Sequence, residues 1–412
     1  MPRPRSRLTG RGFGVLALGV ALCAGGWFVR EPALLWPGLF LALLPLGSLV
    51  AVTLGDPGLT VGRRVQPAEV EADDPVEVEV TLLQRRPTVA AALVVEERPP
   101  SALGGARTFL LPAPGRGRTT RESYSVRPGR RGRYAIDDLR YRYADPLGLA
   151  VREARPRGPA ELVVLPRVLP LSGAEPAASG RTGETALPHL ALSGPDDVLV
   201  REYRPRDDVR RIHWPSTART GTLMVRREEQ AWDPTAWVVL DTRRGAFAGG
   251  DAGADQFEWW VTLAASIGAT LLDAGYQVSL SEARGVTYTF HPQERGAPVR
   301  DWQRHLVDVN LGGERSLAAA VRTIGQGPAD HLVVALLGRL TLEDARELAQ
   351  LRDGELRCWA FSLPAAPGEA EAEASAIDLL EQHGWRHSHL EVGVDPETRW
   401  RAVAAPAGRR IG

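Results

Sequence analysis

An acidic residue that follows an apolar run is the first position in this chain where chemistry is expected. The run 236–240 ends at Asp241 and Thr242, and two arginines come next. Parallel sheets bind their ligands at the carboxyl ends of the strands, so a ligand would meet these two side chains. The chain contains neither GxGxxG nor GxxxxGK followed by Ser or Thr, so the sequence does not support nucleotide binding.

Three of the eight histidines form a second candidate cluster near the C-terminus. His383, His387 and His389 stand at i, i+4 and i+6 across a predicted helix-to-strand turn, with Glu381 and Glu391 nearby. Imidazole and carboxylate groups are ligands for transition metals. The favoured interpretation is nevertheless that these histidines are exposed or packed near a sheet edge.

A dense mixture of arginine and aspartate fills residues 201–221. One interpretation is a solvated loop whose local ion pairs contribute about 0–1 kcal/mol each. A second is a fixed network, because arginine forms bidentate contacts with carboxylates. Its members would be Arg201, Arg211 and Arg219 with either Asp207 or Asp208, and Trp214 would be an apolar anchor. A third is contact with an anion or a nucleic acid, although the interleaved acids and the lack of a stacking series disfavour it.

Composition limits the classes of function that need to be considered. The chain has 412 residues and a net charge of zero, and every basic residue is arginine. A neutral chain has no overall field to attract nucleic acid. The two cysteines, Cys23 and Cys358, lie far apart in sequence and predict neither a disulfide nor a metal site. This length favours two or three folded units.

Two uncharged apolar runs near the N-terminus predict a membrane hairpin within residues 1–58. They cover residues 13–29 and 32–54, and a transmembrane helix needs about 17–25 residues. Arginines precede the first run and follow the second, whereas only Arg30 lies between them. The positive-inside rule therefore predicts that both termini and the soluble parts are cytoplasmic. A cleaved signal peptide is the alternative, but no clear small-x-small cleavage site is present.

The region 59–167 alternates apolar and polar residues with a period of two, as in Val76 to Val80. Short runs of this kind between Pro- and Gly-rich turns predict a small antiparallel β-sandwich. No pairing of a nucleophile with a base occurs here, so the region is interpreted as a structural or docking module.

Residues 168–200 are rich in Ala, Gly, Ser and Pro and are interpreted as a linker before the charged segment 201–230.

Residues 231–412 alternate apolar strands with amphipathic helices. This pattern predicts an α/β domain with a doubly wound parallel sheet that is covered on both faces. The predicted strands are 236–241, 277–280, 331–337, 356–361 and 388–392, and the predicted helices are 255–274, 302–307, 316–324, 341–351 and 376–383.

Residues 201–230 read REYRPRDDVRRIHWPSTARTGTLMVRREEQ. This segment resembles the signature of the domain of unknown function 58 family. Two shorter segments, RRGRY at 130–134 and DPLGL at 145–149, resemble further family motifs in the same order. The matching signature residues are Arg201, Tyr203, Asp207, Arg211, Trp214, Ala218 and Arg219. The chain departs from the pattern at Arg206, His213 and Pro215, so a function tied to an acid at 213 is in doubt.

The resemblance implies a membrane hairpin, a β-rich region and a C-terminal domain similar to von Willebrand factor A, in the plasma membrane of a bacterium. Family members are commonly encoded beside MoxR-type AAA+ ATPases and transglutaminase-like membrane proteins. No biochemical activity is established for the family. The resemblance therefore implies these two kinds of protein as partners.

Von Willebrand factor A domains often hold Mg²⁺ through Asp-x-Ser-x-Ser together with a distant Thr and Asp. In this chain Asp241 and Thr242 remain, but Arg243 and Gly245 occupy the two serine positions. Arginine repels a cation, so the resemblance implies a degenerate metal site. Asp241 is expected to pair with an arginine instead, for example one from residues 201–219.

Three functions follow from these observations. The preferred one is a membrane-anchored cytoplasmic adaptor that works with the ATPase and has no catalysis, cofactor or metal of its own. The second is a ligand-binding module with a working metal-dependent site. The third is a metal-assisted hydrolase that uses Asp241 and the histidine cluster.

Overall fold

The computed structural model describes residues 5–88, 92–112, 117–172, 200–203, 212, 214–226, 234–292, 297–327, 331–351, 357–366 and 368–404. The chain forms two compact units. The first contains residues 1–167 and 303–309, and the second contains residues 168–302 and 310–412.

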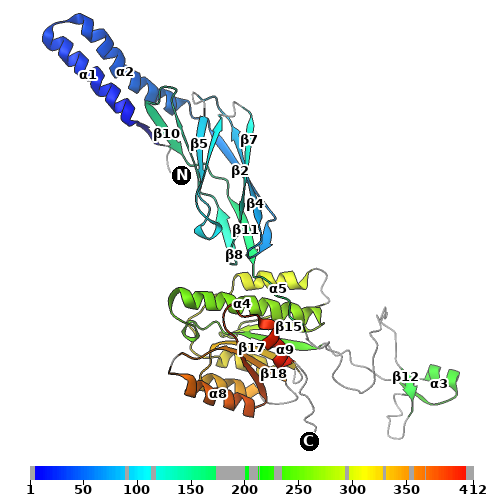
Figure 1. The fold of residues 1–412 in the computed structure, drawn as a ribbon. Coiled ribbons are helices and arrows are strands. Elements are labelled where there is room, and N and C mark those ends of the chain that lie inside the picture. The colour runs from blue at the N-terminus through cyan, green and yellow to red at the C-terminus, as the bar shows by residue number, and fades with distance from the viewer. Residues whose placement is uncertain are drawn as a thin grey trace. The chain divides into compact units, whose positions relative to one another are not determined.

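The first unit begins with a hairpin of two apolar helices, α1 (Gly10–Val29) and α2 (Pro32–Leu54) (Figure 1). Both are long and apolar enough to cross a membrane, which confirms the two predicted apolar helices. Helix α1 starts three residues earlier than expected because Thr9 caps it: the Thr9 hydroxyl accepts a hydrogen bond from the Gly12 backbone N–H at 3.1 Å.

Small residues allow α1 and α2 to pack closely. A Cβ atom on Gly19 would lie 2.4 Å from the backbone nitrogen of Ala42, and one on Gly38 would lie 2.7 Å from Cys23 Sγ. Small residues at helix interfaces are typical of packing in lipid, where backbones approach each other closely. The outward surface of the hairpin is apolar, since Trp27 and Phe28 are 81% and 89% exposed.

Eleven described strands build the β-rich region, in three sheets. The sheet orders are β1-β10-β9-β5-β6, β2-β4-β7 and β3-β11-β8. The strands are β1 (Arg5–Leu8), β2 (Leu59–Gln66), β3 (Glu69–Glu71), β4 (Val76–Gln84), β5 (Ala92–Glu97), β6 (Arg107–Pro112), β7 (Thr119–Val126), β8 (Gly132–Ile136), β9 (Leu139–Ala144), β10 (Ala150–Ala154) and β11 (Ala160–Leu165).

Two features of this region differ from the predicted antiparallel sandwich. Strand β3 pairs with β11 in parallel. Strand β1 precedes the hairpin in the sequence and still joins the five-stranded sheet, where it pairs with β10. The alternating runs point their apolar residues inward, so Val76, Val78 and Val80 are buried. Period-two burial is therefore confirmed, whereas the pairing of short edge strands was not predictable from the pattern.

The charged segment contains two short strands and a helix. Strand β12 (Val200–Glu202) pairs antiparallel with β13 (Met224–Arg226). Helix α3 (Trp214–Thr220) lies between them in sequence and was not predicted.

The second unit contains a six-stranded sheet in the order β16-β15-β14-β17-β18-β19. All neighbours are parallel except β16, which pairs antiparallel with β15. The strands are β14 (Thr235–Leu240), β15 (Gln277–Glu282), β16 (Thr287–Phe290), β17 (His331–Arg339), β18 (Arg357–Leu363) and β19 (Trp385–His389). Mixed α/β structure is thus confirmed, and β16 is an addition that the sequence did not predict.

Helices cover both faces of this sheet (Figure 1). One face packs against α6, α7 and α8, whose apolar residues share a core with Trp237, Val239 and Val333. The other face packs against α4 and α9: Trp260 donates from Nε1 to the Leu337 carbonyl, and Trp400 stacks on Phe361. The helices of the second unit are α4 (Gly250–Asp273), α6 (Ala318–Gly325), α7 (Leu342–Leu348), α8 (Ala370–Gln382) and α9 (Pro396–Ala404), the last of which was not predicted. Helix α5 (Pro298–Val307) begins in the second unit and ends in the first.

Candidate functional site at the carboxyl edge of the α/β sheet

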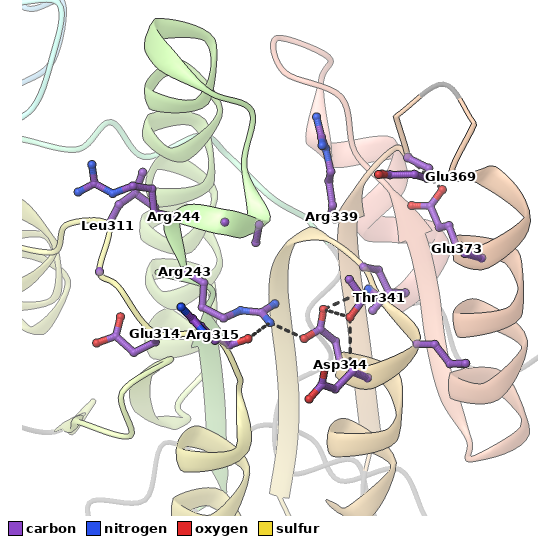
Figure 2. A pocket seen from close by; sticks show the side chains of 18 of the residues that line it. Arg243, Arg244, Leu311, Glu314, Arg315, Arg339, Thr341, Asp344, Glu369 and Glu373 are labelled. Atoms are coloured by element: carbon purple, nitrogen blue, oxygen red, sulfur yellow. Dashed lines mark hydrogen bonds and ion pairs between the residues drawn. The ribbon is translucent and has the colours of Figure 1, made fainter.

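A cavity of about 910 Å³ opens at the carboxyl ends of the central strands (Figure 2). Its walls come from the turn after β14, the loop 311–315, the end of β17 with the start of α7, and the start of α8. Strand β14 has β15 on one side and β17 on the other, so the strand order reverses at this point. Ligands of open parallel sheets bind at such reversals.

Arg243 joins two acidic side chains at the base of this cavity. Its Nε and Nη2 atoms donate to the two carboxylate oxygens of Asp241, both at 2.9 Å. Its Nη1 donates to Asp344 Oδ1, the contact drawn as a dashed line in Figure 2. Asp344 is held in place by a capping box, in which Thr341 and Asp344 bond to each other's backbone N–H groups.

These three charged groups are buried and satisfied. The side chains of Asp241, Arg243 and Asp344 are 0%, 7% and 2% exposed. Burial by itself lowers the pKa of Arg243, but the hydrogen bonds and charges of the two aspartates outweigh it and raise that pKa above its ordinary value. Asp241 also accepts backbone hydrogen bonds from Arg243 and Gly338, at 3.0 and 3.1 Å.

The residues present do not fit a divalent cation at Asp241. The guanidinium group of Arg243 fills the position between the carboxylates, and a second positive charge there would be repelled. Thr242 is buried, and its hydroxyl accepts a hydrogen bond from the Ala283 N–H at 3.3 Å. Among the described residues, the arginine that pairs with Asp241 is therefore Arg243, two positions along the chain, and not one from residues 201–219.

Three further arginines surround the cavity from three different segments of the chain. Arg244 follows β14, Arg315 lies in the loop before α6, and Arg339 ends β17. None of their side chains forms a hydrogen bond or an ion pair with another described residue. Figure 2 shows Arg244 and Arg339 extending away from the Arg243–Asp344 pair. Glu369 and Glu373 stand on the α8 side, so the rim has positive and negative sectors.

The signature residues are only partly described. Arg201 lies in β12, Tyr203 follows it, and Trp214, Ala218 and Arg219 belong to α3. Trp214 is 66% exposed, which differs from the expected role as an apolar anchor. Asp207 and Arg211 lie outside the described residues, so the proposed arginine–aspartate network remains a prediction.

The histidine cluster is divided by the structure. His383 Nδ1 lies 2.8 Å from its own helix's Leu379 carbonyl. His387 Nε2 lies 2.9 Å from Ser362 Oγ, and His389 Nδ1 lies 3.5 Å from the same atom. The described residues contain no group of three His, Cys, Asp or Glu side chains placed to hold a metal ion.

A serine beside a histidine is also the arrangement of a nucleophile and its base. Ser362 is fully buried, however, so a substrate has no access to it. Burial, together with the nearby His389, lowers the pKa of His387 to about 4, which makes it a weak base. Sequence reasoning missed this contact because β18 and β19 create it: their register pairs Ser362 with His389 and Ala360 with His387.

Comparison with known proteins identifies one family. The model of the family described as "Protein of unknown function DUF58" matches residues 199–347. A Bacillus subtilis protein described as "Uncharacterized protein YeaD" is 26% identical over 356 residues, which cover 82% of this chain and 83% of the relative.

Two solved structures resemble parts of this chain at low sequence identity. One is the CARDB domain of a Pyrococcus furiosus protein in complex with di-metal ions. The match covers 26% of this chain and 93% of the domain's chain, at 16% identity and a TM-score of 0.19. The other is proximal thread matrix protein 1 from the mussel byssus. The match covers 42% of this chain and 47% of the mussel protein's chain, at 11% identity and a TM-score of 0.28. Neither likeness supports an argument about function. Residues 199–347 match the DUF58 model, which confirms for this part of the chain the resemblance predicted from the sequence.

Proposed function

We propose that this protein is a membrane-anchored, cytoplasmic adaptor that presents its α/β cavity to a protein partner and catalyses no reaction itself. The apolar, outward-facing surface of the hairpin supports the anchor, because exposed tryptophan and phenylalanine side chains along two long helices suit lipid. The arginines that flank the hairpin support the cytoplasmic side.

The observation that carries the proposal is the Arg243 bridge between Asp241 and Asp344. The bridge places a permanent cation where a metal-dependent site would need a vacant position. The surrounding cavity retains three arginines whose side chains have no partner among the described residues, and which are suited to contact acidic side chains of another protein. The strand order, with its antiparallel edge strand, is compatible with the von Willebrand factor A-like fold implied by the resemblance.

The partner proposed from the family resemblance is a MoxR-type AAA+ ATPase, with a transglutaminase-like membrane protein as the third component. An adaptor on the cytoplasmic face of the membrane would be within reach of a soluble ATPase. The ATPase would supply the energy, and this chain would supply the membrane location and the binding cavity.

Co-purification from mild detergent tests the proposal. The full chain should enrich an AAA+ ATPase over an unrelated membrane bait. The double variant Arg244→Glu/Arg339→Glu should reduce that enrichment at least tenfold. Two attractive contacts of about 1 kcal/mol each would be lost, and the new glutamates would repel the acidic groups of the partner.

The matched control is Arg322→Glu/Arg346→Glu, which makes the same change in charge on exposed arginines of α6 and α7 outside the cavity. This control should co-purify the ATPase as the wild type does. Absence of any AAA+ ATPase from the wild-type sample would remove the partner proposal. Equal losses in both double variants would mean that the cavity is not the contact surface.

A further inference from the structure

A second cavity of about 910 Å³ lies in the first unit, on the outer face of the five-stranded sheet beside the start of α1. We propose that this cavity binds the phosphate headgroup of an anionic phospholipid in the leaflet that the hairpin enters. The proposal rests on the membrane anchoring proposed above. It does not depend on the α/β cavity or on the ATPase.

The sheet register places positive and apolar side chains on the same face. Arg142 pairs with Val94, and Val94 pairs in turn with Leu110, so these three form one row across β9, β5 and β6. Arg7 lies beside Val151 on the neighbouring strands β1 and β10. All five line the cavity, together with Phe13 from the first turn of α1.

The two arginines of this cavity are available to a ligand. Arg7 and Arg142 are exposed and form no hydrogen bond or ion pair with another described residue. By contrast, Arg152 on the opposite face of the same sheet is fully engaged: it bonds Asp56 at 3.0 and 3.2 Å and Ser6 at 2.9 Å. Two guanidinium groups without a partner among the described residues, beside the apolar side chains of Val94 and Leu110, match a phosphate with attached acyl chains.

Exposed apolar residues continue from the cavity toward the hairpin. Leu110 is 72% exposed and Phe13 is 60% exposed. In the loop after β9, Leu147 is 57% exposed and helps to line an apolar cavity of about 500 Å³ against α2 residues that include Ser48. Ser48 stands six residues before the end of α2, or about 9 Å along the helix axis. The loop therefore reaches the depth at which the apolar helix would be in lipid.

Hydrogen bonds fix this face to the hairpin. The Thr9 hydroxyl donates to the Gly148 carbonyl at 2.7 Å, and the Thr9 N–H donates to the Leu149 carbonyl at 2.9 Å. The Tyr143 hydroxyl donates to the Val52 carbonyl at 2.7 Å. The cavity consequently keeps a set distance from the point where α1 enters the apolar layer, which is the position of lipid headgroups.

Native mass spectrometry of the detergent-solubilised full chain measures the predicted binding. Phosphatidylglycerol should bind the wild type with at least tenfold higher affinity than phosphatidylcholine, and Arg7→Gln/Arg142→Gln should abolish that preference. Arg64→Gln/Arg118→Gln removes the same charge from exposed arginines outside the cavity and should retain the preference. Thermal unfolding midpoints that match the wild type show that both variants are folded.

Two other results would overturn the lipid assignment. Equal affinity for both lipids in the wild type would show that no headgroup is selected. Displacement of phosphatidylglycerol by inorganic phosphate at similar concentration would show a site for free anions. Carbonate extraction of cell membranes separates these results from failure of the anchor, because an anchored chain stays in the pellet whatever lipid it binds.

Discussion

At the residue scale, the chemistry of the α/β cavity depends on which charged groups already have partners. Asp241 was identified from the sequence, since an acid after a buried strand marks the binding edge of a parallel sheet. Its pairing with an arginine was also expected. The bridge to Asp344 was not, because Asp344 lies 101 positions after Arg243 and reaches it only because β17, which leads into α7, pairs with β14.

Replacing Arg243 with alanine should destabilise the second unit by about 3–5 kcal/mol, because two buried carboxylates would lose their countercharge. Thermal unfolding of the full chain in mild detergent should show the loss as a lower midpoint. The adjacent, exposed Arg244→Ala is the matched control and should change stability by less than about 0.5 kcal/mol.

The same variant should gain a response to magnesium. Without the guanidinium group, Asp241 and Asp344 present carboxylate oxygens that suit a hard cation. Millimolar Mg²⁺ should therefore raise the unfolding midpoint of Arg243→Ala and leave the wild type unchanged. A wild type that is stabilised by Mg²⁺ as much as the variant would contradict the assignment of Arg243 as the resident cation.

His387 should make stability depend on pH between about 4 and 6.5. Its pKa is about 4 in the folded chain, below the ordinary 6.5, owing to burial and to the charge of His389. The unfolded chain binds more protons in this interval, so stability falls as the pH drops from 6.5 to 4, by about 2 kcal/mol, and this loss ends below pH 4. His387→Gln should flatten that slope, whereas the exposed His291→Gln should leave it in place.

At the element scale, long apolar segments were predicted well and short edge elements were not. The two hairpin helices and the strands β14, β15, β17 and β18 have apolar patterns long enough to define them. Strand β16 and helix α9 were missed. Two of the four side chains of β16 are exposed and two are half-buried, so the place of this strand depends on pairing with β15 and not on its own composition.

Glycine positions explain how the two hairpin helices approach each other. Gly19→Leu should separate α1 from α2, because its side chain would meet the backbone of Ala42 and Gly38 at less than 3 Å. The thermal midpoint in detergent should fall. Gly14→Leu, on the same helix with nothing within 4 Å of its Cβ position, should have little effect. Equal midpoints for both variants would mean that the helices do not pack through Gly19.

At the scale of the whole molecule, the sequence predicted a membrane hairpin, a β-rich region and an α/β domain in that order, and the apolar helices and mixed α/β character are confirmed. The units are stabilised by separate hydrophobic cores. Arginine asymmetry and family resemblance supply the proposed orientation and partner, because neither property is encoded in the packing of one chain.

Site-specific photo-crosslinking in intact cells tests the central claim most directly. A photoreactive amino acid at Arg339, on the rim of the α/β cavity, should crosslink to an AAA+ ATPase. The same amino acid at Tyr288, on the edge strand β16 and outside the cavity lining, should not. This result would place the cavity in the cytoplasm and in contact with the proposed partner. Crosslinks from Arg339 to periplasmic proteins would contradict the account. So would an ATPase crosslink from Tyr288 with a yield equal to or higher than that from Arg339.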